Sequence, residues 1–265
     1  MLSNIAFIGS GKITEAWIER LISSGTLSPE KIIACDPSDT RLQQLQTKYP
    51  GLNTSTDNAD GARFGSILVI ATPPPDVIPV LTKLRPMLRD DATVISLAAG
   101  VPLAKLVIAA QGVTILRVMP NTPSMVGEGM NLVCFASKIE TAIRKKVEDL
   151  LSVFGQSLEI AEQDMEAYGA LCSVSPTFLF PMMQSLIASA VEAGLPESLA
   201  RMATAQVFVG AGRLVAMTQR SVPELNNMIG LHTLAEPQAM RLVADAYKEA
   251  LAKLNGLAAR MAAAA

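Results

Sequence analysis

The stretch Ile5-Ala6-Phe7-Ile8-Gly9-Ser10-Gly11 decides the fold of this chain. Its four apolar residues are typical of a buried strand, and the Gly-x-Gly that follows opens a segment, 16–23, with a helical pattern. A glycine turn between a strand and a helix points backbone N–H groups at a ligand, which suits the phosphates of a dinucleotide. Thr14 replaces the third glycine of the usual pattern, and the small Ala16 can supply the close helix–strand contact. A tight turn without a ligand is the alternative.

Short apolar runs alternate with amphipathic segments through the first half of the chain. Continuous apolar strands separated by helices predict a parallel sheet covered on both faces. Right-handed crossovers then make it a doubly wound α/β domain of the Rossmann type. The predicted strands cover 5–8, 32–35, 67–71, 93–96 and 114–116, and the predicted helices cover 16–23, 40–48, 77–88 and 103–110.

From about Gln163 onward, long Ala-, Met- and Leu-rich segments predict an all-α dimerisation domain. We place the boundary near 156–162, which gives a dinucleotide-binding domain over 1–158 and a helical domain over 159–265. No Gly/Ser-rich linker separates them, so the two domains are expected to pack together. Apolar residues on several helix faces predict a homodimer or a higher homo-oligomer. The predicted helices cover 165–172, 178–192, 198–218 and 237–261.

Composition excludes several classes of partner. Half of the 265 residues are hydrophobic, aromatics make up 4%, and the net charge is -2, which argues against nucleic acid and against an anionic membrane. No uninterrupted apolar run reaches about 18 residues, so no membrane helix is expected. The N-terminus has no signal-peptide pattern, and the three scattered cysteines suit neither disulfides nor a metal site. We therefore expect a cytoplasmic protein without a metal.

The first candidate cofactor residues surround the glycine turn and the end of the second predicted strand. Gly9, Ser10, Gly11, Lys12 and Ile13 form the phosphate turn, where Lys12 adds a positive charge or, equally, points to solvent. Asp36 is placed to bind a ribose 2′-hydroxyl. Ser38 and Arg41 can donate to a 2′-phosphate, which favours NADP, with NAD as the alternative. The other interpretation is that Ser38 or Asp39 caps the following helix.

Two further blocks carry a family resemblance: Ser96-Leu97-Ala98-Ala99-Gly100-Val101, and Arg117-Val118-Met119-Pro120-Asn121-Thr122-Pro123 followed by Gly127 and Gly129. Together with the glycine turn, with 192–196 and with 206–212, they resemble pyrroline-5-carboxylate reductases over nearly the whole chain. The resemblance implies reduction of a cyclic imine with NAD(P)H in proline biosynthesis. It also implies helical domains that intertwine as dimers and often assemble further.

These blocks fall where ligands bind in this fold class, beyond the carboxyl ends of the strands. Small side chains allow a cofactor to approach the backbone, and Asn121 can donate to and accept from a carboxamide or a ribose. The alternative is a rigid turn that Asn121 braces internally. The remaining candidate cofactor residues are Ala71, Thr72, Pro73, Ala98, Ala99, Gly100 and Asn121.

Two segments depart from the family pattern. A Ser-Gly-Ser-Gly-Pro-Ala turn is expected where Cys172-Ser173-Val174-Ser175-Pro176-Thr177 stands. The Ser-Pro-Gly-Gly-Thr-Thr loop that holds the substrate carboxylate in the family is replaced by residues 229–237, which lack the twin glycines and carry Glu236. A carboxylate there would repel an anionic substrate.

Catalytic residues are not identified by any motif. Ser175 is a candidate because it lies in the turn 172–177, which departs from the family pattern. His232 could donate a proton to an imine nitrogen or be an ordinary surface residue. Because the cofactor carries the hydride chemistry, no catalytic triad or metal is required. The leading hypothesis is an NAD(P)H-dependent reductase of a small cyclic imine. The alternative is a dimeric paralogue that binds a dinucleotide without substrate turnover.

Overall fold

The computed structural model describes residues 4–137 and 139–264. The chain forms two compact units. The sheet unit consists of Met1–Val174 and Ala250–Ala265, and the helical unit consists of Ser175–Glu249. These two units are defined by which residues pack together in space. The boundary between 158 and 159 is placed where the composition of the sequence changes, so it stays a prediction.

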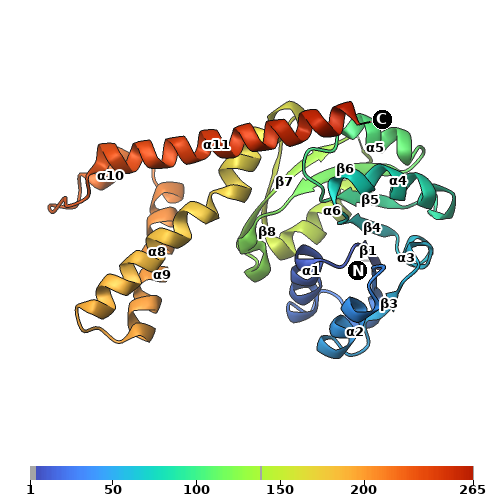
Figure 1. The fold of residues 1–265 in the computed structure, drawn as a ribbon, viewed down its shortest axis with the longest axis horizontal. Coiled ribbons are helices and arrows are strands. Elements are labelled where there is room, and N and C mark those ends of the chain that lie inside the picture. The colour runs from blue at the N-terminus through green and yellow to red at the C-terminus, as the bar shows by residue number, and fades with distance from the viewer. Residues whose placement is uncertain (1–3, 138, 265) are drawn as a thin grey trace. The chain divides into compact units, whose positions relative to one another are not determined.

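The sheet unit is built on one eight-stranded sheet of order β3-β2-β1-β4-β5-β6-β7-β8 (Figure 1). β1 pairs in parallel with both β2 and β4, so the strand order reverses there. This is the switch point at which doubly wound sheets bind ligands. The strands are β1 Ile5–Ile8, β2 Ile32–Cys35, β3 Asn53–Ser55, β4 Ile67–Ile70, β5 Thr93–Ser96, β6 Thr114–Met119, β7 Gly129–Phe135 and β8 Gly155–Glu159.

The five predicted strands are confirmed, and three others were not expected. β3 was missed because Asn53-Thr54-Ser55 is polar and lies at the edge of the sheet, where only one neighbour pairs with it. β7 runs antiparallel to β6, and β8 runs parallel to β7, so the last part of the sheet departs from the βαβ alternation. The predicted fold class, a doubly wound sheet followed by helices, is confirmed.

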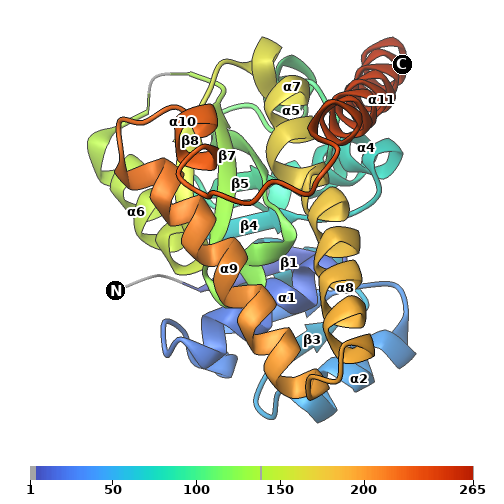
Figure 2. The ribbon, with the colours of Figure 1, turned by 90° about the vertical axis from the view of Figure 1, so that its left-hand side faces the viewer.

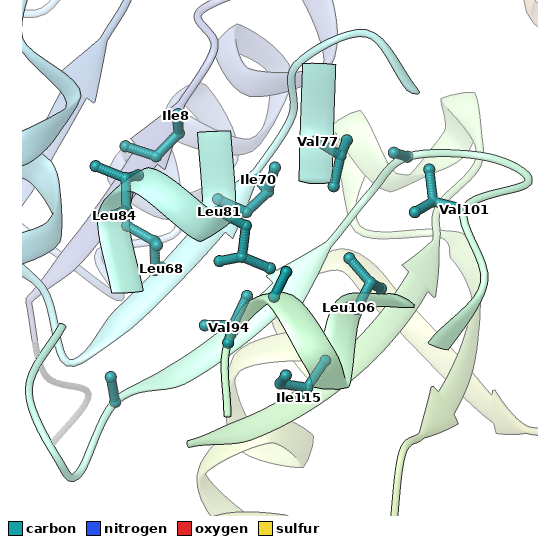
Figure 3. Close-up of a cluster of buried hydrophobic side chains, with 14 of the residues drawn as sticks. Ile8, Leu68, Ile70, Val77, Leu81, Leu84, Val94, Val101, Leu106 and Ile115 are labelled. Carbon is teal, nitrogen blue, oxygen red and sulfur yellow. The ribbon is translucent and has the colours of Figure 1, made fainter. Parts of the chain in front are cut away.

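The two faces of the sheet bury different side chains of the same strands. Along β1, Ala6 and Ile8 join one core cluster, whereas Ile5 and Phe7 join the other, as the period of two along a strand requires. Figure 3 shows the first cluster, where Val77 and Leu81 lie over the side chains of the central strands. The covering helices are α1 Lys12–Ser23, α2 Asp39–Lys48, α3 Asn58–Phe64, α4 Pro74–Leu84, α5 Leu103–Ala109, α6 Thr141–Leu151 and α7 Met165–Gly169.

The second cluster contains the only tryptophan of the chain. Trp17 of α1 is 1% exposed and stacks on Phe154 with ring centroids 4.2 Å apart. The Trp17 and Phe7 rings are T-shaped to each other, with centroids 6.4 Å apart. Replacing such a side chain by alanine typically costs about 3–5 kcal/mol, so this aromatic group fixes α1, and with it the glycine turn, against the sheet.

The helical unit contains α8 Pro176–Glu192, α9 Glu197–Met217, α10 Val222–Asn226 and the first part of α11 Glu236–Ala263. α8 and α9 pack as a hairpin (Figure 2). Pro176 opens α8, and Gly194, with φ +92°, turns the chain between α8 and α9. Large apolar side chains of this unit are exposed within the single chain, including Met217 of α9, Met240 of α11 and Leu231 of the loop between α10 and α11.

One continuous helical stretch, Glu162–Glu192, is long and apolar enough to cross a membrane by length and composition alone. It has 31 residues and a mean hydropathy of 1.3 in its most apolar window. Core helices of soluble proteins pass the same criterion. The expectation of no membrane span therefore stays a prediction.

Candidate cofactor-binding site

The glycine turn between β1 and α1 is preformed by its own hydrogen bonds. Gly9 has φ +93°, and a Cβ built there would lie 2.8 Å from the Ala71 carbonyl oxygen, so glycine is required. The Gly9 N–H donates to the Cys35 carbonyl at 2.8 Å. Thr14 is fully buried, and its hydroxyl donates to the Gly9 carbonyl at 2.6 Å. Thr14 therefore replaces the third glycine by holding the turn from within the helix.

Gly11 differs from Gly9, because a Cβ built on it lies more than 4 Å from every described residue outside its own stretch of chain. It is the N-cap residue of α1 and has extended backbone angles. No side chain caps this helix, so the first N–H groups of α1 lack a side-chain partner from the cap position. An anion fits this place by charge and by space.

Seven of the predicted cofactor residues line one cleft of about 720 Å³ beside this turn. Asn58, Asp76 and Val80 also line it and were not expected from the sequence, because no local pattern marks them. The Thr72 hydroxyl is buried and has no hydrogen-bond partner within the described part of the chain. A buried hydroxyl of this kind is costly unless a ligand or water pairs with it, so the residues fit a polar ligand. The seven are Gly9, Ser10, Gly11, Asp36, Ala71, Thr72 and Pro73.

Asp36 links the end of β2 to the turn. One carboxylate oxygen accepts the Ser10 N–H at 2.8 Å, and the other accepts the Ser38 N–H at 2.9 Å. Ser38 is the N-cap of α2, where its hydroxyl accepts the Arg41 N–H at 3.3 Å. The helix-cap interpretation of Ser38 is thus confirmed, and neither Ser38 nor Arg41 is among the residues that line the cleft.

The Arg41 side chain contacts the backbone of the glycine turn. Its Nε donates to the Ser10 carbonyl at 2.6 Å, and its Nη2 donates to Glu15 at 2.6 Å. Lys48 bridges Glu15 and Glu19 at 2.9 and 2.8 Å. Hydrogen bonds from Arg41 and Lys48 hold the pKa of the Glu15 carboxyl below its usual range, so Glu15 is ionised at neutral pH.

A second cleft of about 580 Å³ is lined by Lys12 and Ile13 from α1 and by the Pro-Asn-Thr-Pro loop. Lys12 is exposed there, which leaves both of its predicted roles open. Asn121 accepts the Met130 N–H and donates to the Cys172 carbonyl, both at 3.1 Å, so it braces the loop as the alternative interpretation proposed. The Ser173 hydroxyl also lines this cleft and is buried without a hydrogen-bond partner in the described chain.

Ala98, Ala99 and Gly100 are not among the lining residues of these clefts. Gly100 has φ +74°, and a Cβ there would lie 3.0 Å from the Ala258 backbone nitrogen of α11. The close approach that this small segment permits is therefore that of the C-terminal helix. Contact of these three residues with a cofactor stays a prediction.

The two weak catalytic candidates lie in the helical unit. His232 Nδ1 is 3.4 Å from a Glu236 carboxylate oxygen, and the Asn226 amide donates to the same oxygen at 2.9 Å. These side chains line a hollow of about 590 Å³ together with Thr233 and several apolar residues. Ser175 is the N-cap of α8. No contact in the structure assigns a catalytic role to His232 or Ser175.

A buried ion cluster was missed by the sequence analysis. Arg117 is 3% exposed in β6 and pairs with Glu162 at 3.0 Å and Glu166 at 3.4 Å. Glu162 also accepts the Leu103 N–H at the start of α5, at 2.6 Å. A charged residue inside an otherwise apolar strand was the available signal, because a buried charge requires a partner.

Cysteine and metal chemistry find no support in the described residues. Burial raises the pKa of the Cys35 thiol to about 12, so this thiol is not a nucleophile at neutral pH. Over residues 4–137 and 139–264, no group of three or more His, Cys, Asp or Glu side chains is arranged to hold a metal ion.

A sheet with a glycine turn at its switch point and a cleft beside that turn defines the dinucleotide-binding class of α/β proteins. The chain is 33% identical to the pyrroline-5-carboxylate reductase of Corynebacterium melassecola over 228 residues, 84% of each chain. It is 32% identical to that of Methanosarcina acetivorans, over 88% of this chain and 89% of the relative. The chain belongs to the pyrroline-5-carboxylate reductase family.

Family models and solved structures agree with this assignment. Residues 4–100 match the model for coenzyme F420-dependent NADP oxidoreductases, and residues 162–257 match the model for the pyrroline-5-carboxylate reductase dimerisation region. The structure of a Plasmodium falciparum pyrroline carboxylate reductase with NADP bound superposes with a TM-score of 0.83, at 25% identity, over 97% of this chain and 98% of that one. These similarities support a pyridine-nucleotide oxidoreductase and do not favour the paralogue without turnover.

Proposed function

We propose that this protein reduces a small cyclic imine with a pyridine nucleotide, with pyrroline-5-carboxylate as the first candidate substrate. The observation that carries the proposal is the cleft at the switch point, which gathers Gly9, Gly11, Asp36 and the unpaired hydroxyl of Thr72. Relatives named as this reductase cover most of the chain, which supports the same reaction here.

The nucleotide, when bound, supplies the hydride, and the chain supplies binding and orientation. The N–H groups at the start of α1 hold the diphosphate, because the helix N-terminus is positive and Gly11 leaves open space before it. Asp36 accepts a ribose hydroxyl, since its carboxylate lines the cleft while the Ser10 and Ser38 N–H groups keep it oriented. Ser38 and Arg41 near the end of β2 favour NADP over NAD.

The second cleft is proposed to receive the reacting end of the nucleotide and the imine. Adjacent residues, Gly11 and Lys12, line the first and the second cleft respectively, so one extended molecule can occupy both. The Ser173 hydroxyl offers an unpaired polar group there, and Asn121 keeps the facing loop rigid. An iminium is already electrophilic, so orientation and exclusion of water account for the chemistry that the protein must provide.

The helical unit is proposed to form a homodimer, in which the exposed apolar side chains of α8, α9 and α11 are buried. Pairing of this kind also accounts for the apolar stretch Glu162–Glu192 without a membrane. The odd number of cysteines suits a reducing cytoplasm.

The decisive experiment is a turnover assay with NADPH and NADH against pyrroline-5-carboxylate and a panel of cyclic imines, with and without a carboxylate. Oxidation of the nucleotide that depends on imine and enzyme is expected. Tight nucleotide binding without turnover of any imine would instead establish the dinucleotide-binding paralogue.

A further inference from the structure

Arg41 is shared between the phosphate turn and a carboxylate of α1. Its Nε donates to the Ser10 carbonyl and its Nη2 to Glu15, each at 2.6 Å. The Arg41 and Glu15 side chains are 25% and 26% exposed, so solvent and ligands can reach the pair.

Ser10 places opposite charges on its two sides. Its N–H donates to the Asp36 carboxylate at 2.8 Å, while its carbonyl accepts from Arg41. In this fold class the acid after the second strand binds the ribose 2′-hydroxyl of NAD, whereas an arginine nearby accommodates the 2′-phosphate of NADP. Both groups are present here, and the structure shows the arginine already paired.

We propose that Glu15 sets the preference between NADPH and NADH by holding Arg41 behind the phosphate turn, so that a 2′-phosphate must replace the Glu15 carboxylate on the guanidinium. The inference rests on the proposed nucleotide site and names Glu15 as a positioning residue that acts through Arg41. It requires no movement of the backbone, because Arg41 has a long side chain that is partly exposed.

The exchange is energetically feasible. Partly exposed ion pairs contribute little to stability, whereas an arginine–phosphate contact is charge-assisted and meets a dianion. When Arg41 leaves, Glu15 keeps Lys48 as a partner, at 2.9 Å, so its charge stays compensated. Glu19 lines the same cleft as Glu15 and bonds to Lys48 and Tyr49, whereas Arg41 bonds to Glu15, so Glu19 serves as the matched carboxylate.

The test measures direct binding of NADPH and NADH to the full-length protein. The fluorescence emission of Trp17 reports binding, because Trp17 is the only tryptophan and lines the second cleft. The variants are Glu15→Gln, Glu19→Gln, Arg41→Ala and the double variant of Glu15 and Arg41. Losing one charge-assisted hydrogen bond is worth about tenfold or more in affinity. Circular dichroism and thermal unfolding verify that each variant is folded.

Glu15→Gln is expected to tighten NADPH by about tenfold relative to NADH, and Glu19→Gln to leave the NADPH/NADH ratio unchanged. Arg41→Ala is expected to weaken NADPH relative to NADH, and the double variant to show no gain from the Glu15 change. An unchanged ratio in Glu15→Gln, or equal shifts in Glu15→Gln and Glu19→Gln, overturns the role of Glu15 while the nucleotide site stands. A wild-type protein that binds neither nucleotide overturns the proposed function itself.

Discussion

The Asp36 carboxylate accepts the Ser10 N–H at 2.8 Å and so ties the carboxyl end of β2 to the glycine turn after β1. Ser10 is fully buried, and its hydroxyl donates to the Cys35 carbonyl at 3.3 Å, one residue before Asp36. Hydrogen bonds to the end of β2 therefore hold the turn in place. A preformed site of this kind binds without the cost of ordering a loop.

Gly11→Val is expected to weaken nucleotide binding strongly while the fold is retained. A Cβ at this position has open space around it, so the new side chain is accommodated by the protein but fills the space in front of α1 where a diphosphate would lie. We expect both NADPH and NADH to weaken by about ten- to a hundredfold, as overpacking costs of about 1–3 kcal/mol imply. Fluorescence titration measures the affinity, and unchanged affinity would remove the assignment of this turn.

Gly9→Ala changes the same turn but is expected to lower the free energy of unfolding, whereas Gly11→Val is expected to lower nucleotide affinity. The residue has φ +93°, and the added Cβ lies 2.8 Å from the Ala71 carbonyl oxygen. A destabilisation of about 1–3 kcal/mol is expected from the strained backbone. Urea denaturation of both glycine variants separates the two roles, and equal stability of Gly9→Ala and wild type would contradict this one.

Arg117→Met should destabilise the sheet unit by about 3–5 kcal/mol, because it leaves Glu162 and Glu166 without their buried cation. The control is Arg144→Met, which removes an exposed pair with Glu159 and should cost about 0–1 kcal/mol. Denaturant unfolding measures both values. Similar losses in the two variants would show that the buried cluster has no special role.

The helical unit should make the protein a dimer or a larger homo-oligomer in solution. Its exposed apolar side chains need a partner surface, and Val207 of α9 is 63% exposed in the single chain. Val207→Glu is expected to weaken assembly, whereas Lys145→Glu on α6 is not. Sedimentation at micromolar concentration checks this, and a stable 28.0 kDa wild-type monomer would refute it.

Glu236→Gln is expected to raise kcat/KM for pyrroline-5-carboxylate by about threefold to tenfold. The family resemblance puts the substrate carboxylate at this loop, where Glu236 adds a like charge. Its side chain is 48% exposed, so solvent screening reduces the repulsion well below the value for a buried pair.

Two comparisons make that assay specific. An imine without a carboxylate should show no gain from Glu236→Gln, because it carries no charge to repel. Glu197→Gln alters the equivalent first residue of α9 and should leave both substrates unaffected. A gain of the same size on both imines would mean that Glu236 acts through structure and not through charge.

The sequence by itself determined the central strands, the glycine turn and the helical second half. Runs such as Ile5–Ile8 and the spacing of Gly9 and Gly11 are local patterns, and local backbone preferences and burial periods act within a few residues. Seven candidate cofactor residues line one cleft because the carboxyl ends of parallel strands meet at one edge.

Only the tertiary structure decided which partners those residues have. Arg41 holds Glu15 from 26 residues away, Asn121 reaches the Cys172 carbonyl, and Gly100 makes room for α11 at Ala258. Contacts of this kind leave no periodic trace in the chain, because they depend on how separate elements pack. The pairing of Arg41 with Glu15, on which the proposed cofactor preference rests, is for that physical reason visible in the folded molecule alone.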